Sequence, residues 1–285
     1  MTAVLTVAAL TLREAARRKV LRALAALTVV LLALSAWGFS RIVTVDPGGA
    51  DLTSGEGRLV ASLLLNLVMF GLSLIAALGT AFLAGPTVAG EVESGAALAM
   101  LARPVRRSAV LAGKWLGLVA FGTGFVTVAG LAQFLIVRWT VGYWPPEPAT
   151  GLALLAVQTT VLLTLGLLLS TAISPMASGV VAVGLFGATW IAGVIGGVGA
   201  ALGNDSVARV GTVSRALLPT DGLWRGAMHA FQDPSALNQF GGDAADGAFP
   251  FLSASGVAPA YLGWAVLWIV VVLGLAGLAF QRRDL

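Results

Sequence analysis

The sequence has no cysteine and a single histidine, His229. The absence of cysteine excludes disulfide bonds, thiolate metal sites and thiol nucleophiles. With one histidine, a histidine-based metal cluster or catalytic triad has almost no side chains to use. We therefore predict neither a catalytic residue nor a metal site on this chain.

Charged residues are also scarce. Asp, Glu, Lys and Arg make up 11% of the 285 residues, whereas 58% are hydrophobic. A soluble domain carries about 25% charged residues, so the composition indicates a protein that resides in lipid. The net charge of +4 does not point to nucleic acid as a partner. The basic residues lie at the ends of apolar runs, where they orient membrane proteins.

Long apolar runs dominate the rest of the chain. A helix needs about 20 apolar residues to cross ~30 Å of hydrocarbon. No charged residue lies between Glu147 and Asp205, and proline at Ser174-Pro175 favours a break that divides this stretch into two spans. The sequence thus predicts a single all-α integral membrane domain, 1–285. Its six spans are 20–40, 59–85, 113–137, 150–173, 177–202 and 259–280.

The distribution of basic residues predicts the orientation. Six spans place both termini on one side, and Lys and Arg gather on the cytoplasmic side of membrane proteins. With both termini in the cytoplasm, 11 of the 17 Lys and Arg residues but only 4 of the 13 acids are inside. The expected topology is therefore N-in and C-in. The inside basic residues are Arg13, Arg17, Arg18, Lys19, Arg22, Arg103, Arg106, Arg107, Lys114, Arg282 and Arg283.

The N-terminal segment, 1–19, has the pattern of an amphipathic helix. Leu5, Ala8 and Leu12 recur at helical spacing, and Arg13, Arg17 and Arg18 mark a polar face. Such a helix lies along the membrane interface. The positive-inside rule alone also explains these arginines, and the two interpretations are compatible.

The segment 86–108, between the second and third spans, carries its acids first and its bases last. That order suits the dipole of a short helix that starts at the acids, and Pro104 would stop it. A charged helix with an apolar ridge suits docking into a groove of another protein, although an ordinary connecting loop is the alternative. The candidate docking residues are Glu91, Glu93, Ser94, Gly95, Leu98, Met100, Leu101, Arg103, Pro104, Arg106 and Arg107.

The region 203–258 is the largest external piece. It alternates apolar residues such as Leu223, Trp224 and Phe231 with charged residues such as Asp221 and Arg225. So much apolar surface argues against a solvated loop, because large exposed apolar patches are rare. We expect short helices that lie against the outer leaflet or cap the spans.

The chain carries no recognisable energy source. It has no GxxxxGK[ST] motif, since Gly113-Lys114 lacks the following Ser or Thr, so no P-loop ATP site is expected. Ion-driven carriers place ionisable residues in the membrane, and the predicted spans have almost none. Polar residues such as Gln133 and Gln158 fit interhelical hydrogen bonds better than substrate ligands. The predicted pathway residues are Asn66, Met69, Phe70, Phe186 and Trp190.

Three motifs near the second span resemble the ABC-2 type transporter permeases. They are Gly-Glu-Val-Glu-Ser-Gly at 90–95, Leu-Ala-Arg-Pro-Val-Arg-Arg at 101–107 and Leu-Ala-Gly-Lys at 111–114. The amphipathic start is similar to the family's elbow helix, and so is the layout of the whole chain. Within the family, Leu-Pro-Thr-Asp at 218–221 with Trp224-Arg225 resembles the permease of the nitrous-oxide-reductase maturation transporter.

The resemblance implies a division of labour. Two permease copies, identical or related, would form the pathway in a cell membrane, here a bacterial inner membrane. Two separate ATPase subunits would bind ATP and Mg²⁺ and would hold the coupling helix at 91–103, while Arg103, Arg106 and Arg107 anchor to acidic lipid or ATPase residues. The second and fifth spans would line the dimer interface, and export is the direction typical of the family.

The hypothesis is thus a permease subunit with no cofactor and no nucleic-acid partner. Its apolar pathway predicts a lipid-like or amphipathic drug-like substrate. Two alternatives stay open at this point. One is a self-powered secondary carrier or channel, and the other is a membrane scaffold or assembly subunit that transports nothing.

Overall fold

The computed structural model describes residues 2–45, 55–93, 106–240 and 249–282. Every regular element in these ranges is a helix, and six of the helices are long and apolar enough to cross a membrane. This confirms the all-α integral membrane fold. The six are α2 (Lys19–Val45), α3 (Gly55–Glu93), α5 (Arg107–Val141), α6 (Pro148–Ala172), α7 (Pro175–Ala201) and α11 (Pro259–Arg282).

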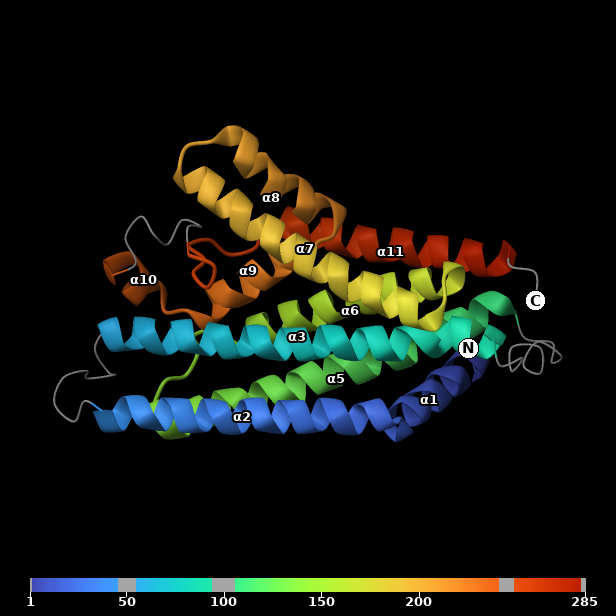
Figure 1. Ribbon diagram of the computed structural model, residues 1–285, viewed down its shortest axis with the longest axis horizontal. Helices are drawn as coiled ribbons and strands as arrows, with labels where there is room; N and C mark the ends of the chain where they lie inside the picture. Colours follow the sequence, from blue (N-terminus) through green and yellow to red (C-terminus); the bar gives the residue numbers. More distant parts are fainter. Residues whose placement is uncertain (1, 46–54, 94–105, 241–248, 283–285) are drawn as a thin grey trace.

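Shorter helices sit at the two ends of this bundle (Figure 1). At one end, α1 (Thr2–Arg17) packs against the start of α5, and α3 and α11 both end at this end of the bundle. We name this the elbow end. At the opposite end, the part of the chain that the structure describes forms three short helices, which we name the cap. They are α8 (Asp205–Leu217), α9 (Thr220–Phe231) and α10 (Pro234–Phe240).

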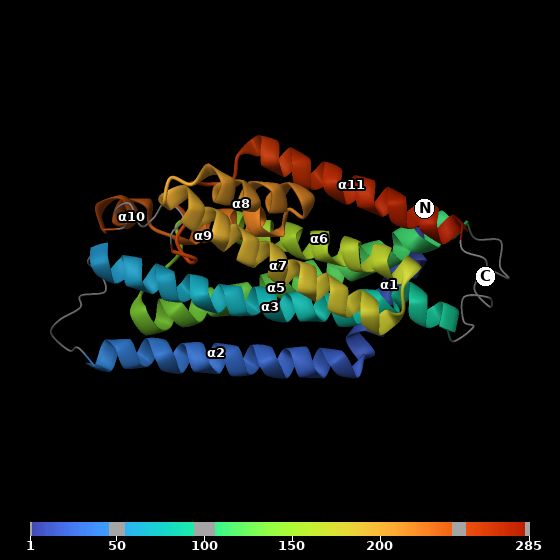
Figure 2. The same ribbon diagram turned by 45° about the horizontal axis from the view of Figure 1, so that its top comes forward.

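The bundle is built around α6. In the most apolar window of each helix, 67% of residues are buried in α6 but only 17% in α2 and in α11. Figure 2 shows α2 and α11 on opposite outer sides, with α3, α5, α6 and α7 between them. The three helices have similar hydropathy, so their different burial means that the outer faces of α2 and α11 are left for lipid.

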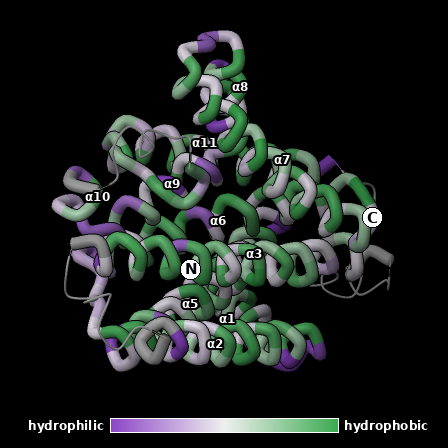
Figure 3. The backbone as a smooth tube through the Cα atoms, turned by 60° about the vertical axis from the view of Figure 1, so that its left-hand side comes forward, coloured by the Kyte–Doolittle hydropathy of each residue, from purple (hydrophilic) through white to green (hydrophobic). Residues whose placement is uncertain are grey.

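The cap has a different character from the spans. Figure 3 shows hydrophobic residues along most of the long helices, with hydrophilic residues prominent on α8 and around α9 and α10. The short helices predicted for 203–258 are therefore confirmed for the described residues. They fold back onto the bundle, so that Trp224, Met228 and Phe231 are fully buried and join its main hydrophobic core.

Glycines allow α8 to fold back against α7. A Cβ at Gly196 would lie 2.5 Å from the Cα of Gly211, and one at Gly199 would lie 2.7 Å from the amide nitrogen of Ala208. Side chains at these positions would push the two backbones apart. The turn between the helices needs a glycine for another reason, because Gly203 has a φ of 66°.

Two helices extend beyond the predicted spans. α3 continues through Pro86 to Glu93, although its most apolar part, Gly57–Thr87, ends close to the predicted residue 85. α5 begins at Arg107, before the predicted start of the third span at residue 113. Proline is tolerated within a membrane helix where neighbouring groups satisfy the backbone.

Candidate functional site

The elbow helix lies directly on the start of α5. A Cβ at Gly113 would come within 2.7 Å of the Val4 carbonyl oxygen, and one at Gly117 within 2.6 Å of the Ala8 carbonyl oxygen. These glycines have GxxxG spacing, which permits close helix approach. Alanine in place of either one would require α1 or α5 to shift, since the obstructing atoms belong to the backbone.

A buried lysine ties α5 to α3 at the same level. The Lys114 side chain is 4% exposed, and its Nζ donates to the Thr87 carbonyl oxygen at 2.6 Å. Lys114 follows the start of α5 by two helical turns, and Thr87 precedes the end of α3 by about the same length. The bond therefore joins the two helices that flank residues 94–105.

The start of α5 is also joined to the end of α11. Arg107 Nη1 donates to the carbonyl oxygens of Gln281 at 3.3 Å and Phe280 at 3.5 Å. The last carbonyls of a helix carry a partial negative charge, so a guanidinium group is favourable there. Arg107 was predicted to bind lipid or an ATPase, and its observed contacts give it a role within the bundle.

Two acids lie at the end of a helix, although they were predicted to lie at the start of one. Glu91 and Glu93 do not start a helix, because they occupy the C-terminal turn of α3. The error arose because Pro86 was taken as the end of the second span. Arg106 is exposed just before α5. The other predicted coupling residues, Ser94, Gly95, Leu98, Met100, Leu101, Arg103 and Pro104, lie outside the described residues.

The amphipathic helix predicted for 1–19 is observed as α1. Arg13 and Arg17 are exposed on it. Arg18, in the short break between α1 and α2, pairs with Glu14 at 2.6 Å. Exposed pairs of this kind contribute little to stability, about 0.3–0.5 kcal/mol. Because Arg13 and Arg17 are exposed, both side chains can contact lipid or a partner protein.

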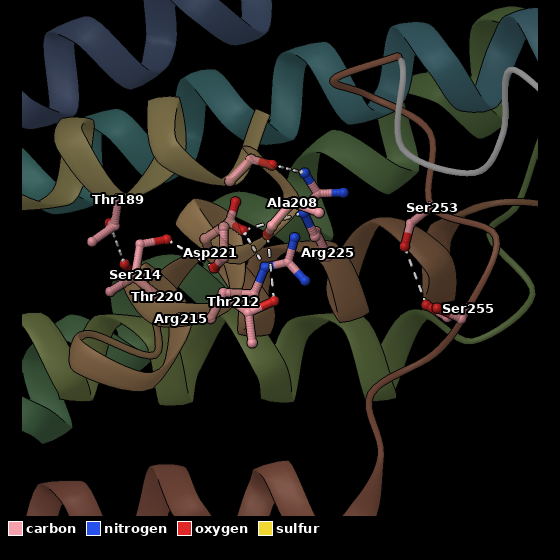
Figure 4. Close-up of polar contacts among 12 residues, drawn as sticks. Thr189, Ala208, Thr212, Ser214, Arg215, Thr220, Asp221, Arg225, Ser253 and Ser255 are labelled. Atoms are coloured by element: carbon pink, nitrogen blue, oxygen red, sulfur yellow. Dashed lines mark hydrogen bonds and ion pairs between the residues drawn. The ribbon is translucent and has the colours of Figure 1, made fainter. Parts of the chain in front are cut away.

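The cap contains an ionic cluster that the sequence analysis missed (Figure 4). Asp221 is 1% exposed, and its Oδ2 accepts hydrogen bonds from Arg215 Nε at 3.0 Å and Arg225 Nε at 3.2 Å. Arg225 Nη2 also donates to the Gly193 carbonyl oxygen of α7 at 2.8 Å. A side chain at Gly193 would overlap the Asp221 carboxylate, so glycine is required for this approach.

This ionic cluster lies beside a predicted span. Gly193 precedes the last residue of α7, Ala201, by eight residues, which is about 12 Å along a helix. The sequence analysis missed this cluster because it forms only when α8 folds back against α7, and no local sequence pattern indicates that packing. Only the i, i+4 spacing of Asp221 and Arg225 could have suggested a pair.

Aromatic side chains of α11 donate hydrogen bonds to the last carbonyl groups of α8. The Tyr261 hydroxyl donates to the Arg215 carbonyl oxygen at 3.2 Å, and the Trp264 and Trp268 indoles donate to the next two carbonyls. The last carbonyls of a helix have no partner within it. These three side chains share one face of α11 and fix the end of α8 to the bundle.

A cavity of about 420 Å³ opens between the cap and α7. Its walls come from α7, α8, α9, the segment 252–258 and the start of α11. Arg215 and Arg225 both line it, together with Thr212, Ser253 and Ser255. The cluster therefore presents its arginines to an open space, whereas Asp221 lies behind them.

Comparison with known proteins decides the class of this membrane protein. Residues 5–285 match the family described as ABC-2 family transporter protein. The chain belongs to the ABC-2 transporter family. It is the membrane-spanning permease subunit of an ABC transporter and is not itself catalytic. A search of curated proteins found no match. The resemblance to the nitrous-oxide-reductase maturation permease stays a prediction.

In this ABC-2 permease, two of the predicted pathway residues lie together. The rings of Phe70 and Trp190 are 4.7 Å apart, and Phe70 also contacts Trp224 at 5.4 Å and Phe251 at 5.7 Å. Phe70 and Trp190 are partly exposed on neighbouring helices, α3 and α7. This aromatic cluster joins the two spans to the cap.

The other predicted pathway residues face inward. Met69 is fully buried in the main core, and Phe186 packs with Ala77 and Leu162 between α3, α6 and α7. Asn66 is also fully buried, and its Nδ2 donates to the Phe251 carbonyl oxygen at 3.0 Å. Since successive helical residues are about 100° apart, Met69 and Phe70 cannot share one face of α3.

Family membership favours one function over the alternatives. A self-powered carrier or channel and a scaffold without transport are both less consistent with an ABC transporter family. Among the described residues, no group of three or more His, Cys, Asp or Glu side chains could hold a metal ion. The arrangement is that of a helical bundle whose charged groups, among the described residues, lie toward its two ends.

Proposed function

We propose that this permease is driven by a separate ATPase, in two copies, which docks at the elbow end and binds the ATP and Mg²⁺. Two permease copies then move a lipid-like or amphipathic drug-like substrate outward across the cell membrane, here a bacterial inner membrane. ATP binding brings the ATPase subunits together and changes how they hold the permease. Work is done only if the two ATPase states hold it differently.

The distribution of basic residues supports a cytoplasmic elbow end. The elbow helix carries Arg13 and Arg17, the next turn carries Lys19 and Arg22, and α11 ends at Arg282. Lys and Arg near the ends of spans favour the cytoplasmic side. An ATPase that uses cytoplasmic ATP has to bind at that end.

The observation that carries the proposal is the joining of α3 and α5 at the elbow end. These helices flank residues 94–105, and the Lys114–Thr87 hydrogen bond fixes one to the other. Arg107 extends the connection to α11, and Gly113 and Gly117 extend it to α1. A partner that pulls on the segment between α3 and α5 therefore moves several spans as one body.

Glu91 and Glu93 are the best candidates for contacts with the ATPase. They lie at the C-terminal end of α3, where the helix dipole disfavours negative charge by about 0.3–1 kcal/mol per residue. Because this position is electrostatically unfavourable for two acids, we infer that they bind a group outside the helix. Basic groups on the ATPase would supply the complementary charge.

The faces of α3 and α7 suit contact with a second permease copy. The two helices lie side by side in both views of the bundle (Figures 1 and 2). They pack closely because Gly85 lies against the Pro175 carbonyl oxygen and Gly179 against the Ala81 carbonyl oxygen. Their outer surfaces expose large apolar residues, among them Leu67, Leu74, Phe82, Leu185 and Ile191.

The aromatic cluster supports an amphipathic substrate. Phe70 and Trp190 are partly exposed at the junction of α3 and α7, next to the proposed interface. Aromatic rings bind apolar and cationic groups over a broad range of shapes. An ion would instead need several oxygen or charged ligands. The resemblance to the permease of the nitrous-oxide-reductase maturation transporter would predict a different substrate. Stimulation of transport by a metal ion would support that alternative.

A charge reversal at Glu91 tests the proposal. The complex with its ATPase is reconstituted in liposomes, and transport of a fluorescent phospholipid analogue is measured together with ATP hydrolysis. Glu91→Lys is expected to insert normally, because a cation suits that helix end, and to lose at least about tenfold of the coupled transport. Full transport by this variant would refute the assignment.

The matched control is Glu147→Lys, which reverses an exposed acid at the opposite end of the bundle. It is expected to keep wild-type transport and ATP hydrolysis. If both variants lose transport equally, surface charge in general is responsible and the elbow end has no special role.

A further inference from the structure

The cavity at the cap has the size and shape of a small-molecule site. Its volume of about 420 Å³ lies within the range of about 300–1,000 Å³ that is usual for ligand pockets. Apolar residues such as Ala200 and Val257 line part of it, and the hydroxyl-bearing residues Thr212, Ser253 and Ser255 line another part. No Asp or Glu is among the described residues that line it.

The charge at the cavity is unbalanced. Two guanidinium groups, of Arg215 and Arg225, share the single carboxylate of Asp221. Their side chains are only 31% and 15% exposed, so the excess positive charge lies largely within the protein. A partly buried excess charge is unfavourable unless a counter-ion or hydrogen-bond acceptors offset it.

Both arginines also have guanidinium N–H donors that their hydrogen bonds to Asp221 and Gly193 do not use. A guanidinium group has five N–H donors. Within the described part of the chain, Arg215 uses Nε for Asp221, and Arg225 uses Nε for Asp221 and Nη2 for Gly193. The Nη groups of Arg215 and the Nη1 group of Arg225 have no hydrogen bond assigned there. Such planar forks of donors match the oxygens of phosphate and carboxylate groups.

We infer that this cavity binds an oxyanion of the phosphate class, held by Arg215 and Arg225, with Thr212 and Ser255 at its rim. Asp221 orients both arginines from behind and cannot neutralise them. The apolar part of the wall accommodates the organic part of a phosphate ester. The anion is either a free phosphate compound or the headgroup of a membrane phospholipid.

The test introduces a negative charge into the cavity without replacing any residue of the ionic cluster. Thr212→Glu places a carboxylate on the cavity wall, and Ser206→Glu places one on the exposed first turn of the same helix, away from the cavity. The thermal unfolding midpoint of the purified full chain is followed by tryptophan fluorescence. Sodium phosphate is titrated in detergent against sodium chloride at equal ionic strength.

The wild type and Ser206→Glu are expected to show a saturable rise of the midpoint with phosphate. Thr212→Glu should weaken this response about tenfold or more, because two like charges at about 4–5 Å repel by more than 1 kcal/mol. If Thr212→Glu does not fold, Ser255→Asp on the opposite wall takes its place, because its exposed side chain makes it a tolerant position.

A second arm distinguishes the source of the phosphate. The same proteins are placed in nanodiscs of phosphatidylcholine alone or with phosphatidylglycerol. Stabilisation by phosphatidylglycerol but not by free phosphate identifies a lipid headgroup, and stabilisation by free phosphate in detergent identifies a soluble ligand. Either result supports the site. No response to either one, or an unchanged response in Thr212→Glu, would overturn it.

Discussion

The two ends of the bundle hold their charged groups in different ways. At the cap, Arg215 and Arg225 pair with the buried carboxylate of Asp221. At the elbow end, Lys114 and Arg107 donate to backbone carbonyl oxygens of other helices, and two acids occupy an unfavourable helix end. The cap thus contains a buried carboxylate shared by two arginines, whereas at the elbow end two basic side chains of α5 reach carbonyl oxygens near the ends of neighbouring helices.

The difference suggests a division between a rigid end and a responsive end. A carboxylate that binds two arginines on different helices ties α8 and α9 together and, through Arg225, to α7. At the elbow end, the Lys114–Thr87 hydrogen bond and the close contact of α1 with α5 join α1, α3 and α5, so a pull on the segment between α3 and α5 moves these helices together. The proposed ATPase then acts on the end that can transmit a movement.

The largest expected effect is loss of the cap's carboxylate. Asp221→Ala leaves two partly buried guanidinium groups without their shared acid, which should destabilise the protein by about 3–5 kcal/mol. Thermal unfolding and the yield of monodisperse protein measure this. Asp205→Ala removes an exposed acid from the first turn of α8 and should cost less than about 1 kcal/mol. Equal midpoints for the two variants would contradict the role of the ionic cluster.

A smaller effect is expected at the contact between the elbow helix and α5. Gly117→Ala places a methyl group against the Ala8 carbonyl oxygen and should destabilise this contact by about 1–3 kcal/mol. Gly124→Ala, two turns further along α5, meets no atom within 4 Å and should stabilise the helix by up to about 1 kcal/mol. Unfolding midpoints and protease cleavage of α1 report the two outcomes, which have opposite signs.

Replacing the lysine between α3 and α5 should affect coupling more than stability. In Lys114→Met the apolar length is kept, and the Thr87 carbonyl loses a donor, for a net cost of about 1–2 kcal/mol. We expect ATP hydrolysis by the complex to continue while substrate no longer stimulates it. Normal stimulation in this variant would show that the Lys114–Thr87 bond does not link the helices functionally.

The smallest effect is expected outside the spans, at the start of α10. Burial raises the pKa of Asp233, but hydrogen bonds from Ser235, the Ala236 amide and Arg58 outweigh it, so the pKa is lowered overall. A lowered pKa in the folded state contributes stability above the ordinary pKa of about 4, and this is lost as pH falls through the folded value. Asp233→Asn should cost less than about 1 kcal/mol at neutral pH.

The pH dependence of the unfolding midpoint shows whether Asp233→Asn destabilises the protein by removing the negative charge or by changing the hydrogen bonds. On acidification below about pH 4, the wild-type midpoint should approach that of Asp233→Asn, because both side chains are then neutral. A constant difference between them at every pH would show that charge at Asp233 contributes nothing.

The spans and the elbow helix were predictable from the sequence because their signals are local. About 20 consecutive apolar residues are required to cross a bilayer, and α1 has a clear polar face. The continuation of α3 beyond residue 85 was not predictable, because proline breaks most helices in water, whereas α3 runs through Pro86 to Glu93. The acids were therefore assigned to the wrong end of a helix.

The site at the cap was not predictable, because its contacts are distant in sequence. Arg225 binds the carbonyl of Gly193, 32 residues earlier, and this requires α8 to fold back on α7. The pathway residues illustrate a related difficulty. Phe70 and Met69 are neighbours of similar hydrophobicity, yet only Phe70 reaches the aromatic cluster, since the rotation of α3 depends on tertiary packing.

The most direct test of the central claim is to purify the tagged permease with its bound subunits and to identify them by mass spectrometry. Two variants are compared with the wild type: a Gly/Ser linker of equal length replaces residues 94–103 in one and 241–248 in the other. The account predicts a stoichiometric P-loop ATPase with the wild type and the 241–248 variant, and none with the 94–103 variant. A permease that purifies folded without an ATPase, or an ATPase retained by the 94–103 variant, would contradict it.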